Sequence, residues 1–246
     1  LRQGAPPLPD GGTPTPPQLA RDGGTLVVGA LVEPTTLHPW FADAAGFDVL
    51  EGVVEGVLRY NAAGRLQPAL ADDFAIASDD MTYAFTLRAG VRFHDGSDLT
   101  SADVVASWQG QGAAGVAGPG SLAWAKIVSI DAPDPRTVVV RTDEPYAPFL
   151  STVAVAPVLP AAVLASADAE ARLASAPVGT GPFRIEGWEP GQAIGLVRFD
   201  GYWGTPARLD RITIRFAPDA ETILRGLESG DVHISGGALG LPAIDG

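Results

Sequence analysis

The first strong pattern in the chain, and the one that most limits its fold, is a nearly continuous apolar run at residues 25–31. Such a run, rich in Val and Leu and without polar alternation, predicts a strand buried on both faces, as in a parallel sheet. Further strands are predicted at residues 81–87, 127–130, 137–141, 183–188, 194–199, 212–216 and 232–234. Helical patterns separate these strands, so the predicted fold class is α/β.

Two helices are predicted in the first half of the chain. One covers residues 47–58, where apolar side chains recur every three or four positions: Phe47, Leu50, Val54, Val57 and Leu58. The other covers residues 101–109 and follows Thr100 and Asp103, whose spacing is that of a capping box.

Two more helices are predicted in the second half. A stretch rich in Pro and Ala covers residues 160–175. The last helix begins after Asp219 as its N-cap and ends at Gly230. Its spacing predicts that Ile223, Leu224 and Leu227 face inward.

Charge and composition exclude several classes of partner. The 246 residues carry 16 basic and 29 acidic side chains, for a net charge of −13, and the basic ones are scattered. Nucleic acids and anionic membranes need a clustered basic surface, so neither is an expected partner. The chain has no Cys, which removes disulfides and thiolate chemistry. No apolar run approaches the ~20 residues of a membrane helix.

Residues 1–24 are rich in Pro and Gly and almost lack large apolar side chains. They bury too little apolar surface to offset the entropy of ordering, so we expect a mobile tether. A leftover of cloning is the alternative. The start lacks the charged-then-apolar layout of a signal peptide, so we expect either a processed product or a cytosolic start.

The strongest candidate for acid/base or metal chemistry is the group His94, Asp95 and Asp98, the one place where a His stands near carboxylates. A metal site needs three or four convergent ligands, and His38 and His233 lie far away in the sequence. The alternative is a turn after a strand, with Asp95 bonded to local backbone. We therefore expect no metal and no cofactor.

Residues 179–182, Gly-Thr-Gly-Pro, are rich in Gly but lack the spacing and the Lys of a phosphate-binding loop. They also lack the spacing of a nucleophile elbow. We interpret them as a backbone crossing where only Gly tolerates the dihedral angles.

Aromatic side chains in expected loops favour a binding protein over a catalyst. They lie beside Gly or Pro, where they could line a cleft: Trp40, Phe41, Trp124, Tyr202 and Trp203. For any single one of them a structural role is the alternative.

Several blocks in order resemble the N-terminal half of family 5 extracellular solute-binding proteins, the peptide- and nickel-binding receptors of bacterial ABC importers. The blocks are Glu33 to Pro39 (EPTTLHP), Leu70 to Asp72 (LAD), Asp80 to Gly96 (DMTYAFTLRAGVRFHDG), Leu99 to Val104 (LTSADV), Pro177 to Phe183 (PVGTGPF) and Tyr202 to Gly204 (YWG). The first block is similar to a family loop that ends Leu-Asp-Pro, with His38 in place of the Asp.

The resemblance implies one lobe of a two-lobed, class II periplasmic-binding-protein fold, with a mixed sheet, helices and an inserted α/β subdomain. Residues 25–45 and 177–235 would form the first subdomain, and residues 46–176 the inserted one. Residues 236–246 would begin the crossover to a second lobe. Since relatives are longer, we expect this chain to be a fragment or a truncated product.

The resemblance also implies a ligand site and partners. Ligand would lie against the segment that contains Asp43, Ala44, Ala45 and Gly46, and near Ser121 and Trp124. Asp43 would meet a cationic group, and the small residues would leave backbone groups open to a peptide. The expected partners are a peptide or small polar solute and the permease subunits of an ABC transporter.

The resemblance further implies a non-catalytic, monomeric receptor outside the cytoplasm. The absence of Cys fits a mature lipoprotein trimmed after its lipid-bearing Cys, so membrane contact would run only through a lipid tether. Two alternatives stay open. One is a hydrolase or metal-dependent enzyme that uses His94, Asp95 and Asp98, and the other is a protein-binding module.

Overall fold

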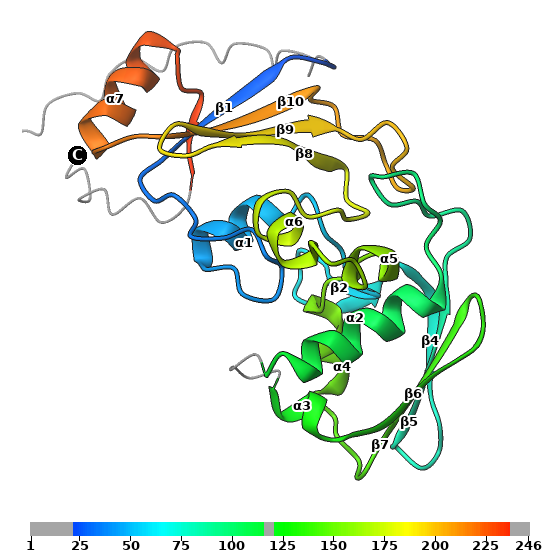
Figure 1. Cartoon of the computed structure of the whole chain (residues 1–246). Coiled ribbons are helices and arrows are strands. Elements are labelled where there is room, and N and C mark those ends of the chain that lie inside the picture. The colour runs from blue at the N-terminus through cyan, green and yellow to red at the C-terminus, as the bar shows by residue number, and fades with distance from the viewer. Residues whose placement is uncertain (1–21, 116–120, 237–246) are drawn as a thin grey trace, which may run out of the picture.

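The computed structural model describes residues 22–115 and 121–236, which form a mixed α/β fold with a five-stranded and a four-stranded sheet (Figure 1). The five-stranded sheet contains β1 (Thr25–Ala30), β8 (Phe183–Glu189), β9 (Ala193–Arg198), β10 (Arg211–Phe216) and β11 (Ile234–Ser235). The four-stranded sheet contains β4 (Ala71–Ile76), β5 (Thr82–Leu87), β6 (Ile127–Asp134) and β7 (Thr137–Thr142). A separate hairpin contains β2 (Leu58–Tyr60) and β3 (Leu66–Pro68).

Strand β1 lies inside the five-stranded sheet, whose order is β11-β1-β10-β9-β8, and it pairs in parallel with both β10 and β11. The parallel pairing was predicted, but the prediction that both faces are buried is wrong. Helix α7 (Ala220–Ser229) covers one face with the buried Ile223. On the other face, Leu26 and Val28 border a cavity, so these side chains are only half-buried.

Helices α2 (Ser101–Ala113) and α3 (Ser121–Ala125) pack against the four-stranded sheet. The core there is aromatic: Trp108 lies edge-on to Phe85 at 5.6 Å and to Phe149 at 6.4 Å between ring centroids. The predicted capping box is confirmed, since the Thr100 N–H donates to Asp103 Oδ2 at 2.8 Å. In the described part of the chain, no helix has the length and apolarity needed to cross a membrane.

The predicted helix at residues 47–58 is wrong in length. Helix α1 (Ala44–Leu50) begins earlier and stops at Leu50, and Leu58 belongs to β2. Tertiary contacts override the helical spacing here. The Val53 and Gly52 carbonyls accept hydrogen bonds from the N–H groups of Gly181 and Phe183 rather than from a further helical turn.

Three smaller predictions also need correction. The stretch at 160–175 is two short helices, α5 (Ala161–Leu164) and α6 (Ala169–Ser175), and α4 (Phe149–Val155) precedes them. Leu224 is exposed instead of facing inward, although Asp219 and Gly230 cap α7 as predicted. Trp124 lies in α3 and not in a loop.

The Gly-Thr-Gly-Pro segment is a crossing, as predicted, but the reason for its glycines differs. Neither Gly179 nor Gly181 has a positive φ. A Cβ on Gly179 would collide with the Val53 carbonyl oxygen, and a Cβ on Gly181 with the Gly52 carbonyl oxygen. Close approach of two backbone segments, and not a dihedral requirement, therefore selects Gly at both positions.

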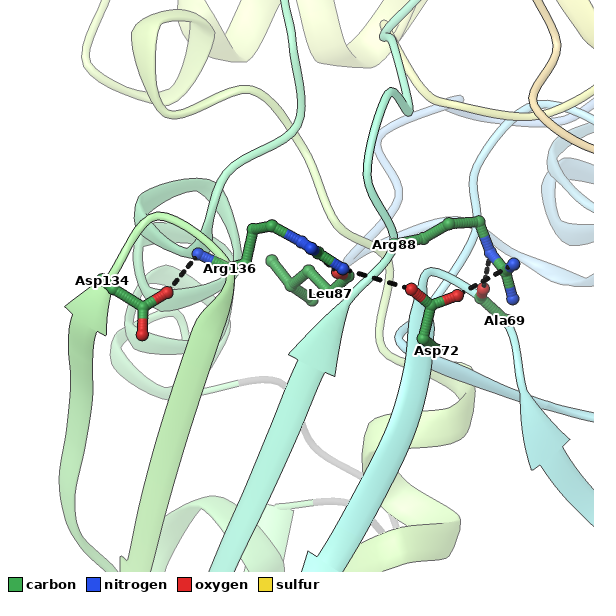
Figure 2. Close-up of polar contacts among 6 residues, drawn as sticks. All are labelled: Ala69, Asp72, Leu87, Arg88, Asp134 and Arg136. Carbon is green, nitrogen blue, oxygen red and sulfur yellow. Dashed lines mark hydrogen bonds and ion pairs between the residues drawn. The ribbon is translucent and has the colours of Figure 1, made fainter.

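Asp72 ties together the ends of three strands of the four-stranded sheet (Figure 2). It pairs with Arg88 at 2.9 Å, just after β5, and with Arg136 at 3.2 Å, just before β7. The Arg136 Nε–H donates to the Leu87 carbonyl at 2.8 Å. The Arg88 guanidinium carbon also lies 4.6 Å from the centre of the Trp203 ring, which links this sheet to the loop after β9.

We expect Gly181→Ala to lower the free energy of unfolding by about 2 to 4 kcal/mol, because the added methyl separates the two backbones that this crossing joins. Urea unfolding followed by circular dichroism measures the loss. The matched control is Gly187→Ala, where a Cβ meets nothing within 4 Å and the expected change is within about 0.5 kcal/mol. Equal losses in the two variants would contradict close approach as the reason for Gly181.

Candidate functional site

The carboxyl ends of β1, β10 and β11 meet at one edge of the five-stranded sheet, where open α/β sheets bind ligands. A cavity of about 730 Å³ lies between α1 and the sheet face opposite α7 and reaches this edge at Leu31, Val32 and Gly236; we call it the carboxyl-edge cavity. Its floor is apolar and is made by alternate residues of two paired strands: Leu26, Val28, Ala30, Ile212, Ile214 and Phe216. Its volume is that of a small-molecule site.

Two of the residues expected to meet ligand, Ala44 and Ala45, line this cavity from the start of α1. Gly46 is buried behind them, and a Cβ there would lie 2.7 Å from the Thr36 carbonyl oxygen. The small side chains therefore keep this wall of the cavity low.

Asp43 shapes the loop before α1. Its Oδ1 accepts from the Gly46 N–H at 2.9 Å as an N-cap, and its Oδ2 accepts from the Thr35 N–H and hydroxyl at 3.0 and 2.9 Å. Burial would raise the pKa of this carboxyl, but these hydrogen bonds outweigh it and lower the pKa below its usual value. A role for Asp43 toward a ligand cation stays a prediction, and its capping role is the one that its contacts provide.

Glu33 is a positioning residue that sequence reasoning missed, although it opens the EPTTLHP block. Its Oε1 accepts from Trp188 Nε1 at 2.7 Å, and both of its oxygens accept from the Gly191 N–H at 3.0 Å. These bonds fasten the chain after β1 to the β8–β9 turn. They set the rim of the cavity, which includes Val32 and Pro34.

His38, which stands where the family loop has Asp, keeps a local capping role. Its Nδ1 accepts from the Trp40 N–H at 3.2 Å, and its Nε2 faces Glu170 at 3.6 Å. Burial lowers the pKa of His38, although Glu170 opposes this shift. A neutral ring with the proton on Nε2 fits both contacts.

Trp124 does not line the carboxyl-edge cavity. Trp124 packs against Trp108 beside the four-stranded sheet, with ring centroids 6.2 Å apart. The side chain of Ser121 lies outside the described residues. Their expected contact with ligand stays a prediction.

The alternative enzymatic site is not supported by geometry, because its three side chains bond to three different partners. His94 accepts from the Gly179 N–H at 3.2 Å through Nδ1 and donates to the Gly181 carbonyl at 3.0 Å through Nε2. Asp95 accepts from Ser97, and Asp98 pairs with the exposed Arg92. Among the residues that the structure describes, no three His, Asp or Glu side chains are grouped to hold a metal ion.

Glu55, which sequence reasoning also missed, joins the chain after α1 to two distant loops. Its carboxylate accepts from Thr180 Oγ1 at 2.9 Å, Tyr202 OH at 3.0 Å and Trp203 Nε1 at 2.8 Å. Burial raises the pKa of Glu55, and these three donors oppose the shift. Two of the aromatic residues expected to line a cleft, Tyr202 and Trp203, thus bond to this carboxylate.

Comparison with known proteins gives consistent matches. The model for bacterial extracellular solute-binding proteins, family 5 Middle, matches residues 65–244. The probable D,D-dipeptide-binding periplasmic protein DdpA of Escherichia coli is 30% identical over 226 residues, which cover 85% of this chain and 42% of that protein. The chain therefore spans less than half the length of this relative.

Solved structures agree with the predicted class II periplasmic-binding-protein fold, which is confirmed. The Helicobacter pylori binding protein DppA, in complex with the peptide STSA, matches with a TM-score of 0.78 and 27% identity over 86% of this chain and 46% of its own. The binding protein AgaA from A.tumefacien, in complex with agropinic acid, matches with a TM-score of 0.75 and 32% identity. The match covers 85% of this chain and 43% of AgaA.

We expect Glu55→Ala to lower the free energy of unfolding by about 3 kcal/mol, because it leaves three donors, one of them on the buried Thr180, without their acceptor. The control is Glu51→Ala, four residues earlier, where the carboxylate is exposed and has no partner among the described residues. That change is expected to stay within about 0.5 kcal/mol. Chemical denaturation of both variants measures the difference. A loss of free energy of unfolding for Glu55→Ala as small as that of the control would contradict the inference that Glu55 holds the two loops together.

We expect the free energy of unfolding of the wild type to exceed that of His94→Asn, and we expect this difference to shrink as the pH falls. Burial lowers the pKa of His94 to about 4 from 6.5, although its bond to the Gly181 carbonyl opposes this. Between pH 6.5 and about pH 4, His94 binds a proton in the unfolded state but not in the folded state. The stabilisation that neutral His94 gives the folded state therefore declines below pH 6.5 and is lost by about pH 4. The full change is about 3 kcal/mol. Denaturation curves across this range measure the gap, and parallel pH profiles would contradict the prediction.

Proposed function

Because this chain belongs to the family 5 bacterial extracellular solute-binding proteins, we propose that it is one lobe of the receptor of an ABC importer. The receptor captures a peptide or a similar small polar solute between two lobes and delivers it to the permease subunits. It works outside the cytoplasm as a monomer, without a catalytic step. In this proposal the receptor contacts the membrane only through a lipid anchor; nearly all of the predicted tether, residues 1–24, lies outside the described residues.

The carboxyl-edge cavity is the observation that carries this proposal. It combines an apolar floor on β1 and β10 with a low wall at Ala44 and Ala45. Exposed backbone beside small side chains suits an extended, peptide-like ligand, which binds by main-chain hydrogen bonds. The ligands named for the matched proteins, a D,D-dipeptide, the peptide STSA and agropinic acid, support a solute of this kind.

Two subdomains within the lobe fit the packing. Each of the larger sheets takes its strands from one predicted part of the chain: residues 25–45 with 177–235, or residues 46–176. Helix α1 packs on the five-stranded sheet, since Val49 and Leu50 share a core with Phe183 and Leu196. We therefore place the junction between the subdomains after α1, near Glu55.

Clamshell closure supplies the second half of the ligand contacts in this proposal. A single lobe should bind weakly, since an open cavity leaves much of the ligand in water. For a tripeptide such as Ala-Leu-Ala we expect a Kd of the order of 1 mM with this chain. Submicromolar affinity in calorimetry would contradict the assignment of the chain as one lobe.

We expect Ala44→Trp to weaken tripeptide binding by about tenfold or more, because the indole fills the mouth of the carboxyl-edge cavity. Titrations followed by backbone amide NMR measure the affinity. The matched control is Ala113→Trp, which places the same side chain at an exposed position at the end of α2 and should leave the affinity unchanged. Unchanged binding by Ala44→Trp would show that this cavity is not the ligand site.

A further inference from the structure

His38 begins the turn of residues 38–42, which leads toward helix α1. Its side chain is buried, and its ring packs against the rings of Trp40 and Phe41, with centroids 5.4 and 4.7 Å away. Its Nδ1 accepts from the Trp40 N–H at 3.2 Å. Its carbonyl accepts from the N–H groups of Phe41 and Ala42, both at 2.9 Å. His38 thus holds this turn together with its side chain as well as its main chain.

The turn positions the backbone that follows it. It is followed directly by the ligand segment, residues 43–46, whose Ala44 and Ala45 line the carboxyl-edge cavity. Just before the turn, the Leu37 N–H donates to the Ala174 carbonyl at 2.8 Å, which fastens the chain to α6. The turn is therefore the backbone between a fastened residue and the ligand segment, and a change in the turn reaches that segment within a few residues.

A histidine can hold this turn only while Nδ1 carries no proton. The similar family loop has Asp at this position, and an Asp side chain also accepts from the backbone N–H two residues on. A carboxylate remains ionised down to about pH 4, whereas a histidine ring that is protonated on both nitrogens can only donate. Protonated His38 would place its Nδ1–H against the Trp40 N–H. With His in place of Asp, the turn therefore becomes sensitive to mild acid.

The surroundings of the ring offer one partner to a charged His38. Glu170 of α6 faces Nε2 at 3.6 Å, and its side chain is 85% exposed. Among the described residues, Glu170 is the charged side chain that acts on the ring, and the packed Trp40 and Phe41 rings are uncharged. Burial lowers the pKa of His38 below 6.5, and Glu170 opposes this shift. Because the folded state favours the neutral ring, the bond to Trp40 is present at neutral pH and is lost as the pH falls below 6.5.

We propose that His38 is a positioning residue that makes the ligand segment sensitive to acid. Protonation of the ring breaks the bond to Trp40, turns the ring toward Glu170 and loosens the turn before Ala44 and Ala45. A solute bound at neutral pH is then released in mildly acidic surroundings. This inference rests on the proposed function and deepens it, because it names a regulation of the same site.

The first experiment follows the turn itself in the full chain without solute. Backbone amide and imidazole NMR signals are recorded from about pH 7.5 to about pH 4.5. We expect the amide signals of Trp40, Ala44 and Ala45 to shift with the same midpoint as the His38 ring. In Glu170→Gln, which removes an exposed carboxylate, all these midpoints should move together to lower pH. A ring midpoint that moves without the amide midpoints would overturn the inference.

The variant His38→Asn separates the two roles of the residue, because its side-chain oxygen can accept from the Trp40 N–H but does not titrate. The pH-dependent amide shifts of the ligand segment should disappear in it. The matched control is His233→Asn, since His233 Nδ1 also accepts from a backbone N–H, that of Val27 at 2.9 Å, and this control should keep the wild-type profile. Equal profiles in wild type and His38→Asn would overturn the inference. Should His38→Asn fail to fold, the joint shift in Glu170→Gln decides.

The second experiment measures release of the tripeptide Ala-Leu-Ala at about pH 7.5 and about pH 5. We expect wild type to bind about three- to tenfold more weakly at the lower pH, which corresponds to the loss of one hydrogen bond. His38→Asn should bind equally at both. Equal affinities of wild type at the two pH values would overturn the inference and leave the proposed function intact. Absence of binding at either pH would overturn both.

Discussion

The partly buried carboxylate of Glu55 is the contact on which the arrangement of the two large sheets depends. It accepts three hydrogen bonds, from Thr180, Tyr202 and Trp203, and the chain on either side of it leads to α1 and to β2. The Trp203 ring in turn stacks on Arg88, which Asp72 holds at the end of the four-stranded sheet. A single carboxyl side chain is suited to this role, because it can accept from several donors at once.

The backbone crossing at residues 179–182 connects the same two parts of the chain as the hydrogen bond between Thr180 and Glu55. The Gly181 N–H donates to the Val53 carbonyl and the Phe183 N–H donates to the Gly52 carbonyl, so two segments far apart in sequence run in direct contact. Both ring nitrogens of His94 also form hydrogen bonds to this crossing, Nδ1 with the Gly179 N–H and Nε2 with the Gly181 carbonyl. A histidine that appeared to be a catalytic candidate is therefore a structural one, and burial keeps it neutral over most of the physiological range.

Sequence patterns predicted those elements whose signals are local. The alternation of apolar and polar residues predicted β5. Capping residues predicted the start of α2 and both ends of α7. Patterns failed where distant segments decide the outcome. The apolar spacing from Phe47 to Leu58 predicts a helix, but the Gly52 and Val53 carbonyls, which a helix as far as Leu58 would use internally, accept from Phe183 and Gly181 instead. The roles of Glu33 and Glu55 had no local signal, because each depends on partners more than 120 residues away. The ligand segment came from resemblance, and the cavity beside it could be seen only once β1, β10 and α1 were assembled.

The early end of α1 leaves a cavity on each of its flanks, namely the carboxyl-edge cavity and a second one that Phe47 and Tyr60 border. Pro182, which follows the crossing, lines both cavities. With only seven residues, α1 buries Val49 and Leu50 against the sheet and leaves its two flanks open. One flank carries Ala44 and Ala45, whose small side chains suit backbone contact, and the other carries Phe47, which offers apolar surface. The close approach at Gly179 and Gly181 therefore keeps the chain after α1 from continuing as a helix toward Leu58, and the short helix leaves both of these walls in place.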